Sequence, residues 1–170
     1  MTALGYVISD GRGAVDRLLT DVAGILQDRG ANLAGVVQIN TEVQTMHRCD
    51  MDLQVLGADQ VVRISQRLGN DALGCRLDPQ GLEEAAGLVE AGLGPQALLI
   101  VNKFGKTEID GRGFRPVIAR ALDGGMPVLV GLNRGNLEGF QGFAEGFGQE
   151  IAADPAAILA WCANQGVAGP

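Results

Sequence analysis

Short apolar runs alternate along the chain with apolar residues at helical spacing. Residues 4–8 form the first run, a glycine-rich turn follows, and residues 15–26 then carry apolar side chains at helical spacing. A second apolar run at residues 33–39 completes a strand–helix–strand unit, and such units connect parallel strands through right-handed crossovers. The pattern therefore predicts a largely parallel sheet.

The middle of the chain predicts a hairpin and a helix. Residues 49–55 alternate in character, and a glycine turn separates them from the apolar residues 61–64, which favours a β-hairpin inserted at the sheet edge. Asp78 followed by Pro79 is typical of a helix start, because aspartate caps free amides and proline fits the first helical position. This helix is expected to end near Gly92.

The second half of the chain predicts another strand–helix–strand unit. Its strands are expected at residues 97–101 and 127–132, and its helix around residues 114–122. Residues 137–150 and 155–164 predict two more helices, the first interrupted by glycines. The expected fold is a three-layer α/β fold, with a largely parallel sheet, helices on both faces and a β-hairpin insertion.

Composition narrows the classes of partner. The 170 residues are 46% hydrophobic and contain no long linker, which favours a single domain over residues 1–170. A formal charge of −7 provides no basic field to attract nucleic acid or an anionic membrane. Three widely spaced cysteines, no visible signal sequence and no apolar run of membrane-spanning length favour a protein of the cytoplasm.

One tetrapeptide occurs twice, each time after a predicted strand and just before a predicted helix. The two copies are Asp10-Gly11-Arg12-Gly13 and Asp110-Gly111-Arg112-Gly113. Glycines let backbone amides turn toward one point and a helix N-terminus adds partial positive charge, so we expect an anion there with arginine as a clamp. The alternative is an ordinary glycine-rich turn before each helix.

Gly105-Lys106-Thr107 matches the end of the phosphate-loop pattern G-x-x-x-x-G-K-[ST], but the match fails. The pattern needs a glycine where Ile100 stands inside a predicted strand, and the next helix is expected several residues beyond Thr107. Lys106 is still expected to face the crevice at the carboxyl ends of the strands, where open parallel sheets bind ligands.

Acidic and soft side chains offer two further candidate sites. Asp50 and Asp52 lie two apart on a predicted strand and face one side, as at a metal or acid–base site, although such a pair usually solvates an exposed face. His47, Cys49 and Cys75 are candidate soft-metal ligands, with inert buried cysteines as the alternative. No serine or cysteine stands in a nucleophile signature such as G-x-S-x-G.

Several motifs in order resemble an uncharacterised bacterial family over nearly the whole chain. They are Cys49-Asp50-Met51-Asp52-Leu53, Ile64-Ser65-Gln66, Gly74-Cys75-Arg76-Leu77-Asp78, Ile100-Val101-Asn102-Lys103-Phe104-Gly105-Lys106-Thr107-Glu108 and Gly111-Arg112-Gly113-Phe114-Arg115. Members of that family are often encoded beside molybdenum-transport genes. The resemblance therefore implies a link to molybdenum transport or metabolism.

The same layout more distantly resembles the small thermophilic P-loop nucleoside-triphosphatases, which carry a phosphate loop after the first strand and an acidic metal-binding motif after a later strand. In this resemblance residues 10–18 occupy the phosphate loop. Three of its parts are replaced: the last glycine by Val15, the lysine by Asp16 and the magnesium-binding hydroxyl by Arg17. Asn102-Lys103 stands in place of Asp-Glu, while Glu108 matches the downstream acid. The resemblance implies a P-loop NTPase-like fold with degenerate Walker motifs.

The leading hypothesis is a protein that binds a nucleotide or small oxyanion at the carboxyl edge of the sheet. Phosphoryl transfer depends on positioning and on the charges that are replaced here, so ordinary hydrolysis is not expected to be efficient. The candidate ligand-binding residues are Asp10, Gly11, Arg12, Gly13, Asn102, Lys103, Lys106 and Arg112. The candidate ligands are a nucleotide with magnesium, or molybdate, a tetrahedral dianion that cationic side chains can hold without a metal.

The nucleoside-triphosphatase resemblance also implies that the two strands before the repeated tetrapeptides are neighbours in the sheet. Their carboxyl ends would then open onto one crevice with a loop on each side. We therefore expect one anion to meet both Arg12 and Arg112.

Two alternatives stay open. An active nucleoside-triphosphatase would use relocated residues: Glu108 or Asp50 for magnesium or water, and Lys106 or Arg112 for phosphate. A non-catalytic interaction module would contact a partner or a second copy of the chain through its glycine-rich C-terminal region. Three phenylalanines there are expected to form either core or a self-association surface: Phe140, Phe143 and Phe147.

Overall fold

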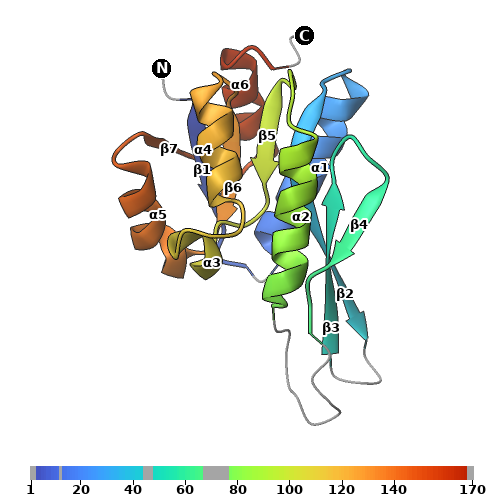
Figure 1. Ribbon diagram of the computed structural model, residues 1–170. Helices are drawn as coiled ribbons and strands as arrows, with labels where there is room; N and C mark the ends of the chain where they lie inside the picture. The colour runs from blue at the N-terminus through green and yellow to red at the C-terminus, as the bar shows by residue number, and fades with distance from the viewer. Residues whose placement is uncertain (1–2, 12, 44–47, 67–76, 168–170) are drawn as a thin grey trace.

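One mixed sheet of seven strands runs through the molecule in the order β4-β3-β2-β5-β6-β1-β7 (Figure 1). The computed structural model describes residues 3–11, 13–43, 48–66 and 77–167. The strands are β1 (Leu4–Ile8), β2 (Leu33–Val43), β3 (Arg48–Val55), β4 (Gln60–Arg63), β5 (Leu98–Val101), β6 (Val128–Leu132) and β7 (Gly148–Ile151). Strands β2, β5, β6, β1 and β7 pair in parallel, and β3 and β4 add an antiparallel hairpin at the β2 edge. The largely parallel sheet and the edge hairpin are confirmed.

Helices cover both faces of the sheet, which confirms the three predicted layers. They are α1 (Ala14–Asp28), α2 (Pro79–Ala91), α3 (Lys106–Ile109), α4 (Arg115–Asp123), α5 (Leu137–Ala144), α6 (Pro155–Asn164) and the 3₁₀ helix η2 (Arg134–Asn136). α2 and α4 pack on one face, and α1 and α6 on the other (Figure 1). Among the described residues no helix is long and apolar enough to cross a membrane.

The central strand β5 shows why a continuous apolar run forms the middle of such a fold. Successive side chains of a strand point to opposite faces. Leu98 and Ile100 lie in the core beneath α1 and α6. Leu99 and Val101 lie in the core beneath α2 and α4. All four are fully buried, and each such side chain contributes about 1.5–3 kcal/mol to stability.

The helix start predicted at Asp78 is confirmed. The Asp78 carboxylate accepts a hydrogen bond from the amide of Gln80 at 3.0 Å, and Pro79 takes the first position of α2. The helix ends at Gly92, as the sequence pattern predicted.

The prediction of helix throughout residues 137–150 is wrong. α5 ends where Glu145 adopts a left-handed conformation with φ 49°, and the chain continues as the edge strand β7 paired with β1. Only Ile151 of β7 is buried, so the strand has no apolar pattern to reveal it. Phe140 is fully buried, with its ring 5.0 Å from that of Tyr6, which makes it core, whereas Phe147 is 70% exposed.

Two predictions near the repeated tetrapeptides are also wrong. A one-turn helix, α3, starts at Lys106, where a loop was expected. The strands before the two tetrapeptides are not neighbours, because β6 lies between β1 and β5 and pairs with both. α1 and α4, the helices that follow the tetrapeptides, pack on opposite faces of the sheet. The arrangement expected to bring both loops to one anion is therefore absent.

Candidate functional site

Three adjoining hollows follow the edge of the sheet where β1, β6 and β5 end. The glycine-turn hollow, of about 320 Å³, is lined by Ser9, Asp10, Gly11, Gly13, Val15, Lys103, Asn133 and Arg134. The Asp16 hollow, of about 300 Å³, is lined by Gly13, Asp16, Arg17, Thr20, Asp21, Gln38, Ile39 and Asn40. The apolar hollow, of about 280 Å³, is lined by Val36, Gln38, Met51, Leu53, Ile64, Leu77, Leu82, Lys103, Phe104, Gly105, Lys106, Thr107, Glu108, Phe114, Asn133 and Asn136. Gly13, Gln38 and Lys103 each line two hollows, so the three form one crevice.

The first tetrapeptide makes the turn that leads from β1 into α1. Gly13 is the N-cap of α1 and has φ 71°, a conformation that favours glycine. The amide of Ala14 donates to the carbonyl of Gly11 at 3.1 Å, which closes the turn. No side chain of the described residues caps α1, so its N-terminus faces the glycine-turn hollow uncapped. Arg12, expected to clamp an anion here, lies outside the described residues.

Asp10 is held by an arginine that the sequence analysis did not identify. The Arg134 side chain donates from Nε to Oδ1 of Asp10 at 2.9 Å and from Nη2 to Oδ2 at 3.2 Å. This pair lowers the pKa of the Asp10 carboxyl from its ordinary value. Arg134 thus brings a cationic group to the glycine-turn hollow, but that charge is shared with Asp10.

Asp16 is the centre of a buried polar network beneath the crevice. Its carboxylate accepts from Nδ2 of Asn102 at 2.5 Å and from Nδ2 of Asn40 at 2.6 Å, and lies 3.3 Å from Nζ of Lys103. The residue is only 2% exposed. A buried carboxylate is tolerated only when it is paired and hydrogen-bonded, and both conditions are met here. The sequence resemblance placed Asp16 at the position of the phosphate-binding lysine, and the structure shows what neutralises it.

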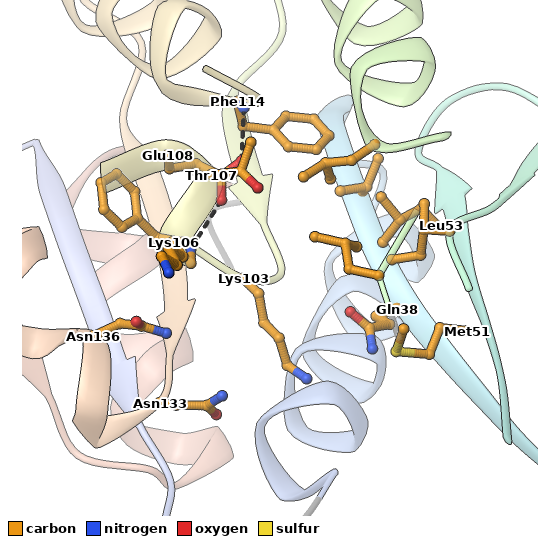
Figure 2. A pocket seen from close by; sticks show the side chains of 16 residues that line it. Gln38, Met51, Leu53, Lys103, Lys106, Thr107, Glu108, Phe114, Asn133 and Asn136 are labelled. Atoms are coloured by element: carbon orange, nitrogen blue, oxygen red, sulfur yellow. Dashed lines mark hydrogen bonds between the residues drawn. The ribbon is translucent and has the colours of Figure 1, made fainter. Parts of the chain in front are cut away.

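Asn102 and Lys103 differ in how free they are to meet a ligand. Asn102 is fully buried, and while its Nδ2 donates to Asp16, its Oδ1 accepts from the amide of Gln38 at 3.0 Å. Its side chain therefore has little capacity left for a metal or phosphate. The Lys103 side chain is one-third exposed and lines both the glycine-turn hollow and the apolar hollow (Figure 2). Because an ammonium group carries three donors, Lys103 can contact an anion while it stays near Asp16.

Glu108, a candidate for handling magnesium or water, is occupied by the backbone. Its Oε1 accepts from the amide of Gly105 at 2.9 Å and its Oε2 from the amide of Phe114 at 3.0 Å (Figure 2). The residue is 2% exposed, and this burial raises the pKa of its carboxyl above the ordinary value while the two amides oppose the rise. Glu108 therefore holds the loop from α3 to α4.

Lys106 is exposed at the rim of the apolar hollow. Its ammonium group makes no hydrogen bond or ion pair with any residue that the structure describes. Asn133 and Asn136 line the same hollow (Figure 2). The expectation that Lys106 faces the crevice agrees with this position.

The second tetrapeptide is already filled by the chain's own carboxylates. The amide of Gly113 donates to Oε1 of Glu83 at 2.7 Å, and the next amide, of Phe114, donates to Glu108. The Arg112 side chain is 67% exposed and lies 4.0 Å from Asp110. Arg112 is not among the described residues that line the crevice.

The carboxylate pair on β3 is bound by the neighbouring strand. Arg63 of β4 donates from Nε to Asp52 at 2.5 Å and lies 3.5 Å from Asp50. Met51, between the two acids, lines the apolar hollow, so alternation directs Asp50 and Asp52 away from it. Cross-strand pairing with Arg63 explains these two acids, whose side chains are only 15% and 19% exposed, so the expected solvation of an exposed face is a minor part of their role.

The soft-metal set lies outside the described residues. His47 and Cys75 are not described, and neither is the side chain of Cys49. Elsewhere, in the parts of the chain that are described, no group of three or more histidine, cysteine or acidic side chains is placed to hold a metal ion.

Sequence reasoning missed Asn133 and Arg134, although a signal for them existed. They follow β6 directly, just as Asn102 and Lys103 follow β5, and parallel strands end at the same edge. Applying the same rule to both strands would have placed all four residues at one crevice.

The strand order, the three layers and the glycine turn between the first strand and the first helix define a P-loop NTPase-like fold. A solved structure with this fold, THEP1 from the hyperthermophile Aquifex aeolicus, matches with a TM-score of 0.61 and 15% sequence identity over 95% of each chain. The chain belongs to the DUF2478 family, described as proteins of unknown function, whose model matches residues 4–161.

One curated relative is also similar in sequence. The molybdenum import ATP-binding protein ModC 2 of Bradyrhizobium diazoefficiens is 32% identical over 150 residues, which is 86% of this chain. The match spans only 16% of that relative's length.

Proposed function

We propose that this chain binds a nucleotide or a small oxyanion at the glycine turn. The observation that carries the proposal is the uncapped N-terminus of α1 at a hollow lined by Lys103 and Arg134. Backbone amides at a helix N-terminus attract anions, and each charged hydrogen bond is worth about 1.5–3 kcal/mol. Because each cation already has an acidic partner, we expect binding of moderate strength, with a Kd below about 1 mM.

Hydrolysis is expected to be slow, because the phosphate loop is degenerate. Where the resemblance expects the loop lysine, Asp16 adds a negative charge that Lys103 neutralises at 3.3 Å. Where it expects a magnesium-binding acid, Asn102 has its side-chain oxygen engaged by Gln38. Removal of one such electrostatic contact commonly lowers the rate of an enzyme by about 10²–10³-fold. Relocated catalysis has little support, since Glu108 holds two amides and Asp50 pairs with Arg63.

A link to molybdenum is part of the proposal. It is supported by the similarity to ModC 2, a molybdenum import ATP-binding protein by name, and by the chemistry of the turn. Molybdate is a tetrahedral dianion, and a helix N-terminus with a lysine and an arginine suits such an ion without a metal. We expect the protein to act in the cytoplasm, as the cysteine pattern of the sequence suggests.

Isothermal titration of the purified protein with ATP, ADP, molybdate and sulfate, each with and without Mg²⁺, tests the proposal. We expect at least one of these anions to bind below about 1 mM, and Mg²⁺ to add little because Asn102 and Asp16 are engaged. The absence of binding by all four at millimolar concentration would overturn the proposed site. Phosphate release from ATP should stay near the background rate, and rapid release would show that the loop is catalytically competent.

A further inference from the structure

The apolar hollow has walls unlike those of a site for a bare inorganic anion. Its walls include Val36, Leu53, Ile64, Leu82, Phe104 and Phe114, each no more than 6% exposed. They come from β2, β3, α2, the segments that follow β4 and β5, and the residue before α4, so the hollow reaches the core beneath α2. Its volume of about 280 Å³ is near the lower end of the roughly 300–1,000 Å³ typical of small-molecule sites.

The rim of the same hollow is cationic. The sequence contains two lysines, Lys103 and Lys106, and both line this hollow. The Lys106 ammonium group has no partner in the described part of the chain, and the nearby Glu108 carboxylate is occupied by backbone amides. An apolar interior with ammonium groups at its mouth complements a molecule that has a flat apolar ring and an anionic tail.

The hollow is continuous with the glycine turn. Lys103 and Asn133 line both the apolar hollow and the glycine-turn hollow. Figure 2 shows the Lys103 side chain extending between Asn133 on one side and Gln38 and Met51 on the other. A ligand with its phosphates at the turn can therefore pass Lys103 and place a ring against the apolar walls.

We infer that the apolar hollow is a subsite for the base of a nucleotide, so that the ligand of this chain is a nucleotide in preference to a bare oxyanion. The inference rests on the proposed function, because it assumes an anion at the glycine turn. A tetrahedral dianion gains nothing from apolar walls, since burial without partners opposes charge. A base gains both removal of apolar surface from water and contact with the rings of Phe104 and Phe114.

Comparing ADP and GDP with pyrophosphate by isothermal titration tests the inference, because these ligands share two phosphorus centres and differ in the nucleoside. We expect ADP or GDP to bind about 10–100-fold more tightly than pyrophosphate, the range that base contacts with aromatic side chains supply. The variant Met51→Trp fills the hollow from its half-buried side and should remove that advantage while pyrophosphate binding stays the same. Val61→Trp, at a 61%-exposed position on the adjacent strand, is the matched control and should change neither affinity.

Lys106→Ala provides a second route that does not depend on repacking the hollow. The side chain is exposed and lines the apolar hollow but not the glycine-turn hollow, where its ammonium can donate to acceptor atoms of a bound base instead of to the phosphates. Its loss should therefore weaken ADP or GDP about 10-fold and pyrophosphate less than two-fold. Equal affinity for pyrophosphate and both nucleotides would refute the subsite and leave the proposed function intact. A nucleotide preference that survives both variants would place the base elsewhere and also refute it. Failure of all three ligands to bind would overturn the proposed function and this inference together.

Discussion

The two Asp-Gly-Arg-Gly loops have the same sequence but different surroundings. The first lies between β1 and α1, where Gly13 caps a helix that no described side chain caps. The second lies between α3 and α4, where the amides of Gly113 and Phe114 donate to the carboxylates of Glu83 and Glu108. One loop presents its helix end to a hollow, whereas the other has anionic partners from its own chain.

This difference teaches that a glycine motif alone does not define an anion site. Both loops have the turn geometry and the helix that such a site needs, and positive φ angles occur in both, at Gly13 and Gly113. What separates them is that amides of the second loop and of the residue after it donate to internal carboxylates, whereas no described side chain accepts from the amides at the start of α1. An external anion can bind only where the chain has not supplied one.

The largest expected effect is on stability, because the last glycine of the second loop is more tightly enclosed than that of the first. A methyl group at Gly113 would overlap the Glu108 carboxylate, whereas at Gly13 the nearest atom is Nη1 of the flexible Arg17 side chain at 3.3 Å. We expect Gly113→Ala to lower the free energy of unfolding by about 2–4 kcal/mol and Gly13→Ala by about 1 kcal/mol. Urea denaturation measures both, and equal losses would contradict the comparison.

The next effect concerns the acid beneath the first loop. Asp16→Asn removes the charge that pairs with Lys103 and places an amide group against the donors of Asn40 and Asn102. We expect a stability loss of about 1–3 kcal/mol and, because the ammonium is released, roughly 10-fold tighter anion binding. Asp21→Asn, on the exposed side of the same helix, is the control and should change stability by less than about 0.5 kcal/mol. Weaker anion binding by Asp16→Asn would contradict this role.

Glu108, the buried acid beside the second loop, should give a pH-dependent contribution to stability. Burial raises the pKa of Glu108, so the folded state favours its protonated form. Its contribution is fully present below the pKa of the unfolded chain and is lost as the pH rises through the higher pKa of the folded chain. The free energy of unfolding of the wild type relative to Glu108→Gln should therefore fall over the pH range that begins at the ordinary pKa of a glutamate, about 4.3, and extends upward through the raised pKa of the folded chain. A difference that stays constant across this range would contradict the prediction.

The smallest expected effect belongs to an arginine of the second loop. Arg112 is 67% exposed and is not among the described residues lining the crevice, so Arg112→Ala should change stability by less than about 0.5 kcal/mol and ADP affinity less than two-fold. Arg134→Ala, a similarly exposed residue that lines the glycine-turn hollow, should weaken ADP about 10-fold. If isothermal titration gave the same change in ADP affinity for both variants, the ligand would not bind preferentially near the first loop, and the comparison would be wrong.

The predictable part of the fold is the part with strong local patterns. The four buried residues of β5 and the Asp78–Pro79 helix start were read correctly from their neighbours in sequence. β7 was missed because only Ile151 is buried. The insertion of β6 between β1 and β5 depends on long-range pairing, which neither strand's own sequence encodes.

The candidate site also has a part that local sequence predicts and a part that it does not. The positions of Gly13 and Lys103 at the crevice follow from where strands end and helices begin, and were predicted on that basis. The partners of Asp16 were not, because its hydrogen bond with Asn102 joins residues 86 positions apart. The internal carboxylates of the second loop were missed for the same reason, since Glu83 lies 30 positions from Gly113.

The acid in the first turn of α1 bears on whether the loop needs its ligand in order to fold. The peptide dipoles of a helix favour an anion near its N-terminus and disfavour a cation there. A lysine at this position would be repelled by the positive end of the helix dipole until a bound phosphate neutralised both charges. The stability of such a loop would therefore depend on whether the phosphate is bound. Asp16 instead satisfies that dipole and has Lys103 as its own counter-ion. Folding of this turn therefore needs no bound phosphate to balance a lysine at the helix end.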